Sequence, residues 1–241
     1  MIDLLQKHTV DLYDLKNKEF ELQKIPAREL ITVSRFDLFA KMTYIKYRKS
    51  NLDYAKKIYT EHIKVFNPDL KEPGREDKNG LEDFITTFDK LIDYFEFNEF
   101  DSEVSLIPVS ETGVILDGSH RLAALAYFDK KVSIIKFKGV QSAAKFDYRY
   151  FIKQGLSIKS VDTITFESSN FIENLFIACL WPKMGNIQNR VFARDYFDSH
   201  FDLLYCKNLK MSLNHLSKFI YDIYNHQGWV GTKDNNFAGA R

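Results

Sequence analysis

Residues 114–125 read Val-Ile-Leu-Asp-Gly-Ser-His-Arg-Leu-Ala-Ala-Leu, and this stretch decides the fold. The first three residues are apolar and predict a strand that ends at Leu116. Asp117-Gly118-Ser119 predicts a sharp turn. The run rich in alanine and leucine that follows predicts a helix from about His120 to Phe128. We therefore expect a strand, a tight turn and a helix in direct succession.

The flanking residues extend this unit into a small sheet. Residues 105–109 and 132–137 are short apolar runs, and each predicts a strand. Further upstream, residues 21–30 predict a short strand that runs into a Pro-Ala turn. Strands that surround helices predict the α+β class, with a mixed sheet.

Three helical patterns lie between the first strand and the others. They begin near Ser34, which is a candidate N-cap, near Asn51 and near Leu81. The second and third patterns are joined by residues 67–80, which hold two prolines, two glycines and many charges, and which predict an exposed loop. We expect three helices at about residues 34–100.

The C-terminal part of the chain has a less regular pattern. The elements that we expect there are helices near residues 142–153, 170–180 and 212–224 and a short strand near residues 201–206. Trp181-Pro182 should end the second of these helices. The chain thus divides into a domain of residues 1–140 and a mainly helical region of residues 141–241.

Composition limits the partners and the location. The 34 Lys and Arg residues nearly balance the 33 Asp and Glu residues, so bulk charge gives no support for a nucleic-acid or membrane-surface partner. No apolar run approaches the roughly 20 residues that span a bilayer, and the N-terminus lacks the pattern of a signal peptide. Cys179 and Cys206 are the only cysteines and form no CxxC pair, as in a protein of the reducing cytoplasm. We expect a cytoplasmic protein.

The chemistry of the turn favours a bound anion. Gly118 lets the backbone turn sharply, and the first amides of the following helix lack partners within it. These amides and the helix dipole attract negative charge, which is worth roughly 0.3–1 kcal/mol at an exposed site. Ser119, His120 and Arg121 add a hydroxyl, an imidazole and a guanidinium at the same place. The alternative is an ordinary helix start that Asp117 or Ser119 caps, but basic residues in the first turn are unfavourable unless an anion offsets them.

These residues also resemble a known family. Residues 107–124, Ile-Pro-Val-Ser-Glu-Thr-Gly-Val-Ile-Leu-Asp-Gly-Ser-His-Arg-Leu-Ala-Ala, resemble the nucleotide-binding core of the ParB/sulfiredoxin superfamily. Its members carry Gly-x-His-Arg or Gly-x-Arg-Arg at a helix start. Residues 25–30, Ile-Pro-Ala-Arg-Glu-Leu, resemble the first strand of that fold. The resemblance therefore implies that the three helices at about residues 34–100 are a helical insertion. The resemblance covers residues 105–137 and implies a nucleoside triphosphate ligand, usually with Mg²⁺.

The family contains three kinds of member, and departures from their patterns narrow the choice. Sulfiredoxin chemistry needs a cysteine beside the His-Arg pair, where this chain has Ser119. Partition proteins, which bind CTP and DNA, follow the core with a basic helix-turn-helix, and residues 141–241 show no pattern of one. The remaining branch implies an ATP-dependent kinase that phosphorylates a hydroxyl of a small molecule. The alternative is a nucleotide-switched module of ParB type, in which CTP or ATP controls binding to DNA or to a protein. A third reading is a domain that kept the fold and lost its ligand.

A looser resemblance bears on the substrate. The chain, with residues 35–41 (Arg-Phe-Asp-Leu-Phe-Ala-Lys), is similar to bacterial proteins found with capsule or lipopolysaccharide synthesis genes. The implied acceptor is a sugar intermediate of surface-polysaccharide synthesis.

Several charged residues are candidates for the chemistry. Asp117 adjoins the turn and is the candidate for Mg²⁺ binding or proton transfer, with helix capping as the alternative. Arg35 and Lys41 could hold phosphate or an anionic substrate, with Asp37 as the base. Asp37 and Lys41 also have the spacing of an i,i+4 ion pair, which stabilises a helix by roughly 0.2–0.5 kcal/mol. His62 is either a site residue or a core histidine with one hydrogen bond, because it lies on the apolar stripe of its helix.

Two segments near the C-terminus carry further polar clusters. Asp198, His200 and Asp202 alternate, as metal ligands on one strand face or as a solvated strand face would. The polar residues 186–190 either bind substrate or form a connection. Zincin, P-loop and α/β-hydrolase motifs do not occur in the sequence.

Overall fold

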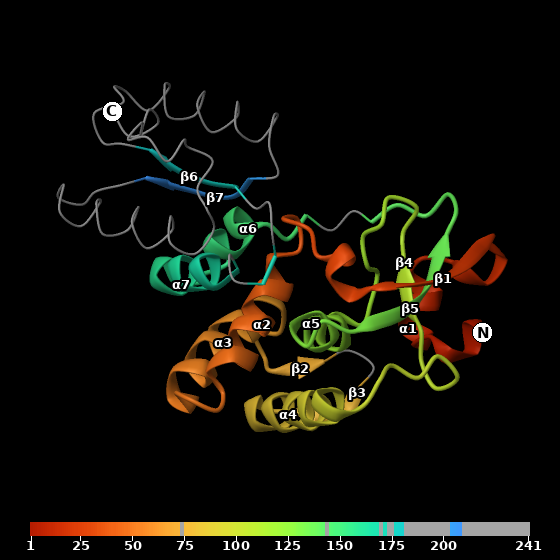
Figure 1. The fold of residues 1–241 in the computed structure, drawn as a ribbon, viewed down its shortest axis with the longest axis horizontal. Coiled ribbons are helices and arrows are strands. Elements are labelled where there is room, and N and C mark those ends of the chain that lie inside the picture. The colour runs from red at the N-terminus through yellow and green to blue at the C-terminus, as the bar shows by residue number, and fades with distance from the viewer. Residues whose placement is uncertain (73–74, 143–144, 169–170, 173–175, 181–202, 209–241) are drawn as a thin grey trace. The chain divides into compact units, whose positions relative to one another are not determined.

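The chain divides into two compact units, Met1–Val161 and Asp162–Arg241, in the computed structural model (Figure 1). The sequence placed this boundary after residue 140. The structure describes residues 1–72, 75–142, 145–168, 171–172, 176–180 and 203–208.

A three-stranded mixed sheet forms the base of the first unit, with the strand order β1-β5-β4 (Figure 1). β1 (Phe20–Pro26) runs antiparallel to β5 (Lys131–Phe137), and β4 (Ile107–Val109) runs parallel to β5. Ile135 of β5 lies opposite both Leu22 and Pro108. The α+β class is therefore confirmed.

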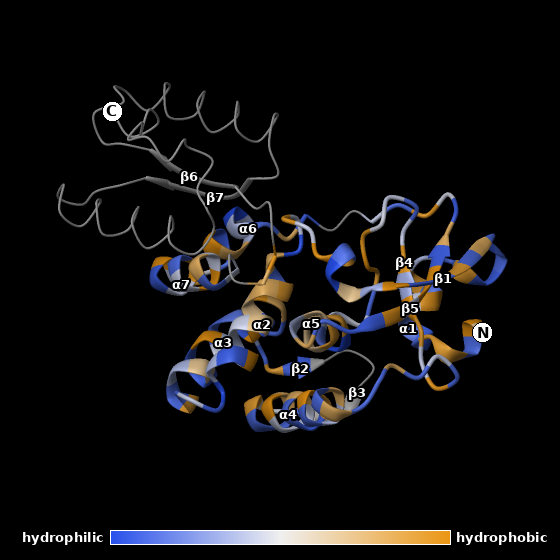
Figure 2. Ribbon diagram, viewed as in Figure 1, coloured by the Kyte–Doolittle hydropathy of each residue, from blue (hydrophilic) through white to orange (hydrophobic). Residues whose placement is uncertain are grey.

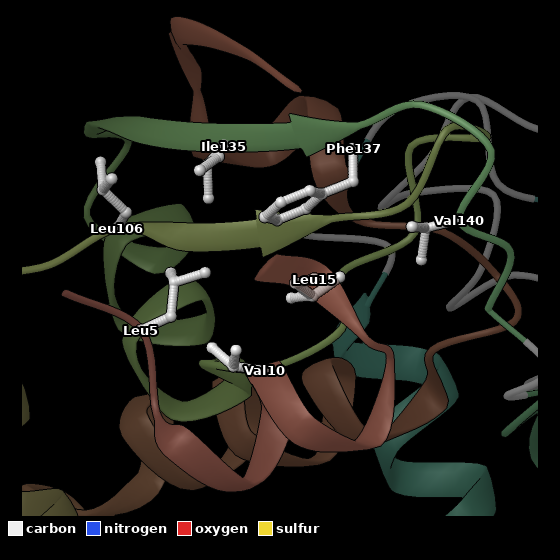
Figure 3. Close-up of a cluster of buried hydrophobic side chains, with 7 residues drawn as sticks. All are labelled: Leu5, Val10, Leu15, Leu106, Ile135, Phe137 and Val140. Atoms are coloured by element: carbon white, nitrogen blue, oxygen red, sulfur yellow. The ribbon is translucent and has the colours of Figure 1, made fainter. Parts of the chain in front are cut away.

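One face of this sheet is covered by the N-terminal residues. They form a 3₁₀ turn η1 (Ile2–Leu4), a helix α1 (Lys7–Leu12) and a second 3₁₀ turn η2 (Leu15–Asn17). Their apolar side chains pack against β5 and the chain beside it (Figure 3). The cluster consists of Leu5, Val10, Leu15, Leu106, Ile135, Phe137 and Val140.

Four helices form the rest of the core of the first unit. These are α2 (Phe36–Tyr47), α3 (Leu52–Phe66), α4 (Leu81–Phe97) and α5 (Ser119–Tyr127). α2 is buried nearly all round, whereas α3 and α4 carry one hydrophobic and one hydrophilic face (Figure 2). The side chain of Asn51 caps α3 by accepting a hydrogen bond from the amide of Tyr54 at 3.3 Å. Three helices thus lie between β1 and β4, as the sequence predicted.

Some local predictions need correction. Arg35, not Ser34, is the N-cap residue of α2, because the Ser34 hydroxyl pairs with that of Thr32 at 2.9 Å. The predicted loop at residues 67–80 contains a short antiparallel hairpin. Its strands are β2 (Lys71–Glu72) and β3 (Arg75–Asn79).

The predicted strand at residues 114–116 forms no full ladder. It folds back on β4 through a single bridge between Val109 and Ile115 and a hydrogen bond from the amide of Leu116 to the carbonyl of Pro108 at 2.8 Å. The tight turn before it and the Gly118 turn after it leave room for little more.

Of the two described helices after β5, the first is shorter than predicted and the second was not predicted. α6 (Tyr148–Lys153) begins only at residue 148, because the side chain of Asp147 accepts a hydrogen bond from the amide of Tyr150 at 3.0 Å and caps the helix there. α7 (Ile158–Ser168) was not predicted.

In the second unit, β6 (Phe176–Leu180) runs parallel to β7 (Leu203–Asn208). The strand expected near residues 201–206 is confirmed. The prediction of a helix near residues 170–180 is wrong for Phe176–Leu180, which form β6. A short apolar run fits a buried strand as well as a helix. The predicted helix at residues 212–224 and its stop at Trp181-Pro182 lie outside the described residues. No described helix is long and apolar enough to cross a bilayer.

Candidate functional site

The turn before α5 requires glycine. Gly118 has φ +83° and is the N-cap residue of α5. A Cβ at this position would lie 2.5 Å from Cδ1 of Ile107 and 2.9 Å from Nη2 of Arg121. The backbone therefore turns in the left-handed region within a tight space, as glycine alone allows.

Neither residue that the sequence offered as a cap fills that role. Gly118, which has no side chain, is the N-cap residue of α5, so neither Asp117 nor Ser119 occupies the cap position. Amide donors at a helix start that side chains leave uncapped, together with the helix dipole, form a favourable place for an anion. This feature of the turn agrees with the anion-binding prediction and not with the capping alternative.

Arg121 and Asp117 lie together beside the turn. Nη1 of Arg121 donates a hydrogen bond to the Ser105 hydroxyl, and Nη2 lies 3.6 Å from Oδ2 of Asp117. Both side chains keep about a fifth of their surface exposed, at 21% and 23%. Within the described part of the chain, Oδ2 of Asp117 is buried and has no hydrogen-bond partner. A cation and a carboxylate, paired with each other, therefore lie next to the helix start.

His120 turns toward the neighbouring helices. Its Nε2 lies 2.8 Å from the hydroxyl of Tyr59 on α3, and its ring meets the ring of Phe88 on α4 edge to face at 4.9 Å. One of its two ring nitrogens is thus engaged by the core and not by the turn.

Arg35, Asp37 and Lys41 form a buried charge cluster on α2. Nε and Nη2 of Arg35 donate to the two carboxylate oxygens of Asp37 at 2.8 and 2.9 Å, and Nζ of Lys41 donates to Oδ2 at 3.0 Å. All three residues are under 10% exposed. The predicted i,i+4 ion pair between Asp37 and Lys41 is confirmed.

The charges in this cluster determine one another's protonation. Burial raises the pKa of Asp37, but the adjacent Arg35 and Lys41 outweigh it and hold this pKa far below its usual value of 3.8. Burial lowers the pKa of Arg35, and the Asp37 carboxylate more than compensates, so that this pKa is raised. A carboxylate with a very low pKa and with both oxygens hydrogen bonded is a poor proton acceptor. The geometry thus gives Asp37 the ion-pair role and not that of the base.

A hydrogen bond from Arg35 connects the charge cluster to the turn. Nη1 of Arg35 donates to the backbone carbonyl of Ile115 at 2.8 Å, two residues before Asp117. Arg35 therefore holds the backbone that leads into the turn while it pairs with Asp37.

His62 lies in the aromatic core next to the charge cluster. It is 1% exposed, and its ring stacks on Phe151 at 5.6 Å and on Tyr59 at 6.0 Å. Among the described residues, neither ring nitrogen has a hydrogen-bond partner. Burial and the charge of Lys41 hold the pKa of His62 well below 6.5, so the ring is neutral at pH 7. The core location matches the structural alternative, but the expected hydrogen bond is missing.

Three contacts of the site could not be found in the sequence. The hydroxyls of Tyr59 and Ser105 and the carbonyl of Ile115 each hold a predicted site residue. Tyr59 lies on a predicted apolar stripe. Its position three residues before His62 is the one sequence signal that could have identified it as part of the site. The candidate metal residues Asp198, His200 and Asp202 and the loop at residues 186–190 lie outside the described residues.

A divalent metal fits the turn only together with a ligand. In the part of the chain that the structure describes, no three His, Cys, Asp or Glu side chains gather as a metal site. Mg²⁺, however, often takes one or two protein carboxylates, with substrate phosphates and waters as its other ligands. Asp117 can supply one such carboxylate beside the helix start.

No protein-family model, no curated protein and no solved structure matches the chain. Its function must therefore be inferred from the residues of the site.

Proposed function

We propose that this chain is a phosphotransferase that binds ATP at the start of α5 and transfers the terminal phosphoryl group to a hydroxyl of a small molecule. The acceptor class that we propose is a sugar intermediate of surface-polysaccharide synthesis. The observation that carries the proposal is a helix start without a side-chain cap, at a left-handed glycine, with Arg121 folded beside it.

In this proposal the phosphates occupy the turn. The backbone at Gly118 allows close approach, the amides and hydroxyl at Ser119 donate hydrogen bonds, and Arg121 supplies a charged donor. Arg121 is partly exposed and is oriented by Ser105 and Asp117, so little ordering is needed when phosphate binds.

Asp117 is the proposed protein ligand for Mg²⁺. When bound with the triphosphate, Mg²⁺ would neutralise negative charge on the phosphate oxygens. The carboxylate has one oxygen without a hydrogen bond among the described residues, which agrees with a role as a ligand. Asp117 is also the nearest candidate for the group that orients the attacking hydroxyl.

The buried cluster supports the turn electrostatically and mechanically. It holds Arg35, Asp37 and Lys41 in fixed positions in a region of low dielectric. In the proposal, the fixed guanidinium of Arg35 stabilises negative charge that develops nearby during transfer. Arg35 also fixes the Ile115 carbonyl and hence the entry to the turn.

A two-stage experiment tests the proposal. Thermal shift with ATP, ADP and CTP, each with and without Mg²⁺, identifies the nucleotide. Phosphorus NMR of the protein with MgATP and a panel of sugars and nucleotide sugars then detects any phosphorylated product. We expect ADP and a sugar phosphate to form together with one acceptor, and Arg121→Ala to abolish the product.

A DNA-binding assay with and without CTP separates the alternative function from the kinase. Salt-sensitive DNA binding that CTP alters, without consumption of ATP, would replace the kinase by a nucleotide-switched module. The absence of any nucleotide effect on the thermal melt would reject both.

A further inference from the structure

Tyr59 and His120 form a hydrogen-bonded pair next to the start of α5. Tyr59 is on α3, is 0% exposed and places its hydroxyl 2.8 Å from Nε2 of His120. His120 is the second residue of α5, in the turn that we assign to phosphate.

The phenol ring has little freedom to move. It packs at a tilt against Tyr44 at 4.8 Å and stacks on Phe88 at 5.4 Å, and Phe88 also meets the imidazole edge to face at 4.9 Å. The hydroxyl is therefore held at one point of the core, and the imidazole is held against it.

A hydrogen bond to one ring nitrogen decides the proton on the other. If the Tyr59 hydroxyl donates to Nε2 of His120, the neutral imidazole must carry its proton on Nδ1. The neutral ring then has a single N–H group, and that group is at Nδ1.

We infer that Tyr59 is a positioning residue: its hydroxyl donates to Nε2 of His120, keeps the proton on Nδ1 and so presents an N–H donor to the phosphates at the start of α5. This inference rests on the proposed function for the purpose of the donor, but the state of the imidazole can be measured without any ligand. His120 then acts through its N–H group, and Tyr59 acts through His120.

The chain offers a matched control. Tyr44 is also fully buried, and its ring packs against Tyr59 and Phe88. Its hydroxyl, however, donates to Oδ1 of Asp89 at 2.9 Å and not to His120. Tyr44→Phe and Tyr59→Phe therefore each remove one hydroxyl from the same aromatic cluster. Only the second removes a hydroxyl that is hydrogen bonded to His120.

Nitrogen NMR of protein labelled at histidine tests the inference directly. The chain has six histidines, and the spectrum of His120→Gln assigns the signal of His120. We expect a neutral imidazole protonated at Nδ1 in the wild type and in Tyr44→Phe, and a mixture of tautomers in Tyr59→Phe. A wild-type His120 that carries its proton on Nε2, or a Tyr59→Phe spectrum identical to that of Tyr44→Phe, would overturn the inference.

Titration with MgATP by calorimetry separates this inference from the proposed function. Loss of one oriented donor should weaken nucleotide binding by about 2- to 10-fold in Tyr59→Phe, and Tyr44→Phe should bind as the wild type does. If the wild type binds and both variants bind equally well, the role assigned to Tyr59 fails and the proposed function stands. If the wild type does not bind, the proposed function fails, and the tautomer measurement still decides whether Tyr59 sets the state of His120.

Discussion

Asp37 shows how much a single residue depends on its surroundings. As part of the sequence it was both a candidate base and the acid of an ion pair. In the structure it is 2% exposed and receives three hydrogen bonds from Arg35 and Lys41. Two buried cations thus share this carboxylate, and its removal would take away the three hydrogen bonds that it accepts from them.

Asp37→Asn is therefore expected to lower the free energy of unfolding by about 3–5 kcal/mol. Urea denaturation at pH 7 measures this loss. Glu99→Gln is the control, because Glu99 pairs with Lys130 at 3.3 Å but is 75% exposed, and such a pair contributes about 0–1 kcal/mol. Equal stability of the two variants would show that the cluster does not need its carboxylate.

At the scale of elements, the turn and α5 were predictable because their signals are local. The order of apolar run, Asp-Gly-Ser and helix former lies within residues 114–125, and α5 begins one residue before the predicted start. The contacts that orient the site were not predictable, because they join residues far apart in the chain. Tyr59 and His120 are 61 positions apart, and Arg35 and the Ile115 carbonyl are 80 apart.

The two turns on either side of residues 114–116 offer a matched pair of glycine substitutions. Gly113 and Gly118 have similar positive φ values of +87° and +83°, but a Cβ at Gly113 would meet nothing within 4 Å. Alanine at either position should cost about 1–2 kcal/mol for the left-handed backbone. Gly118→Ala should cost more, because its Cβ would also displace Ile107 and Arg121.

Chemical denaturation of both variants gives the two costs, and thermal shift with MgATP reports on the turn. We expect Gly113→Ala to keep its response to the nucleotide and Gly118→Ala to lose it. Equal stability and an equal nucleotide response in the two variants would argue against a tight turn at Gly118.

For the whole molecule, hydrophobic periodicity predicted the α+β class, the three helices between β1 and β4 and the strand β7, but it did not predict β6. Residues 176–180 form β6, since their short apolar run pairs with β7 and a local pattern cannot foresee a partner strand. The sequence likewise placed Arg35, Asp37 and Lys41 on one helical pattern and His62 on the next. It could not show that they are buried or that Arg35 joins them to the turn.

The buried neutral His62 should make the stability of the molecule depend on pH. Its pKa is well below 6.5 in the folded chain and returns to about that value on unfolding. Below pH 6.5 the unfolded chain therefore binds a proton that the folded chain does not, and the free energy of unfolding falls as the pH falls. Asp37, whose folded pKa is also lowered, adds to this loss only when the pH approaches 3.8 and below.

His62→Phe isolates this contribution, because a phenyl ring fits the stack with Phe151 and Tyr59. Between pH 7 and pH 5 we expect the variant to lose up to about 2 kcal/mol less stability than the wild type does. Urea denaturation at several pH values measures both slopes. If the free energy of unfolding fell with pH equally in the two proteins, the folded and unfolded chains would bind the His62 proton equally well, and the lowered pKa of His62 would be contradicted.

The most direct test of the central claim is a calorimetric titration of the whole chain with MgATP, in the wild type and in Arg121→Ala. We predict saturable binding with one site per chain in the wild type and no detectable binding in the variant, while the thermal melt of the variant stays close to that of the wild type. No binding to the wild type, or unchanged affinity in Arg121→Ala, would contradict the assignment of phosphate to the start of α5.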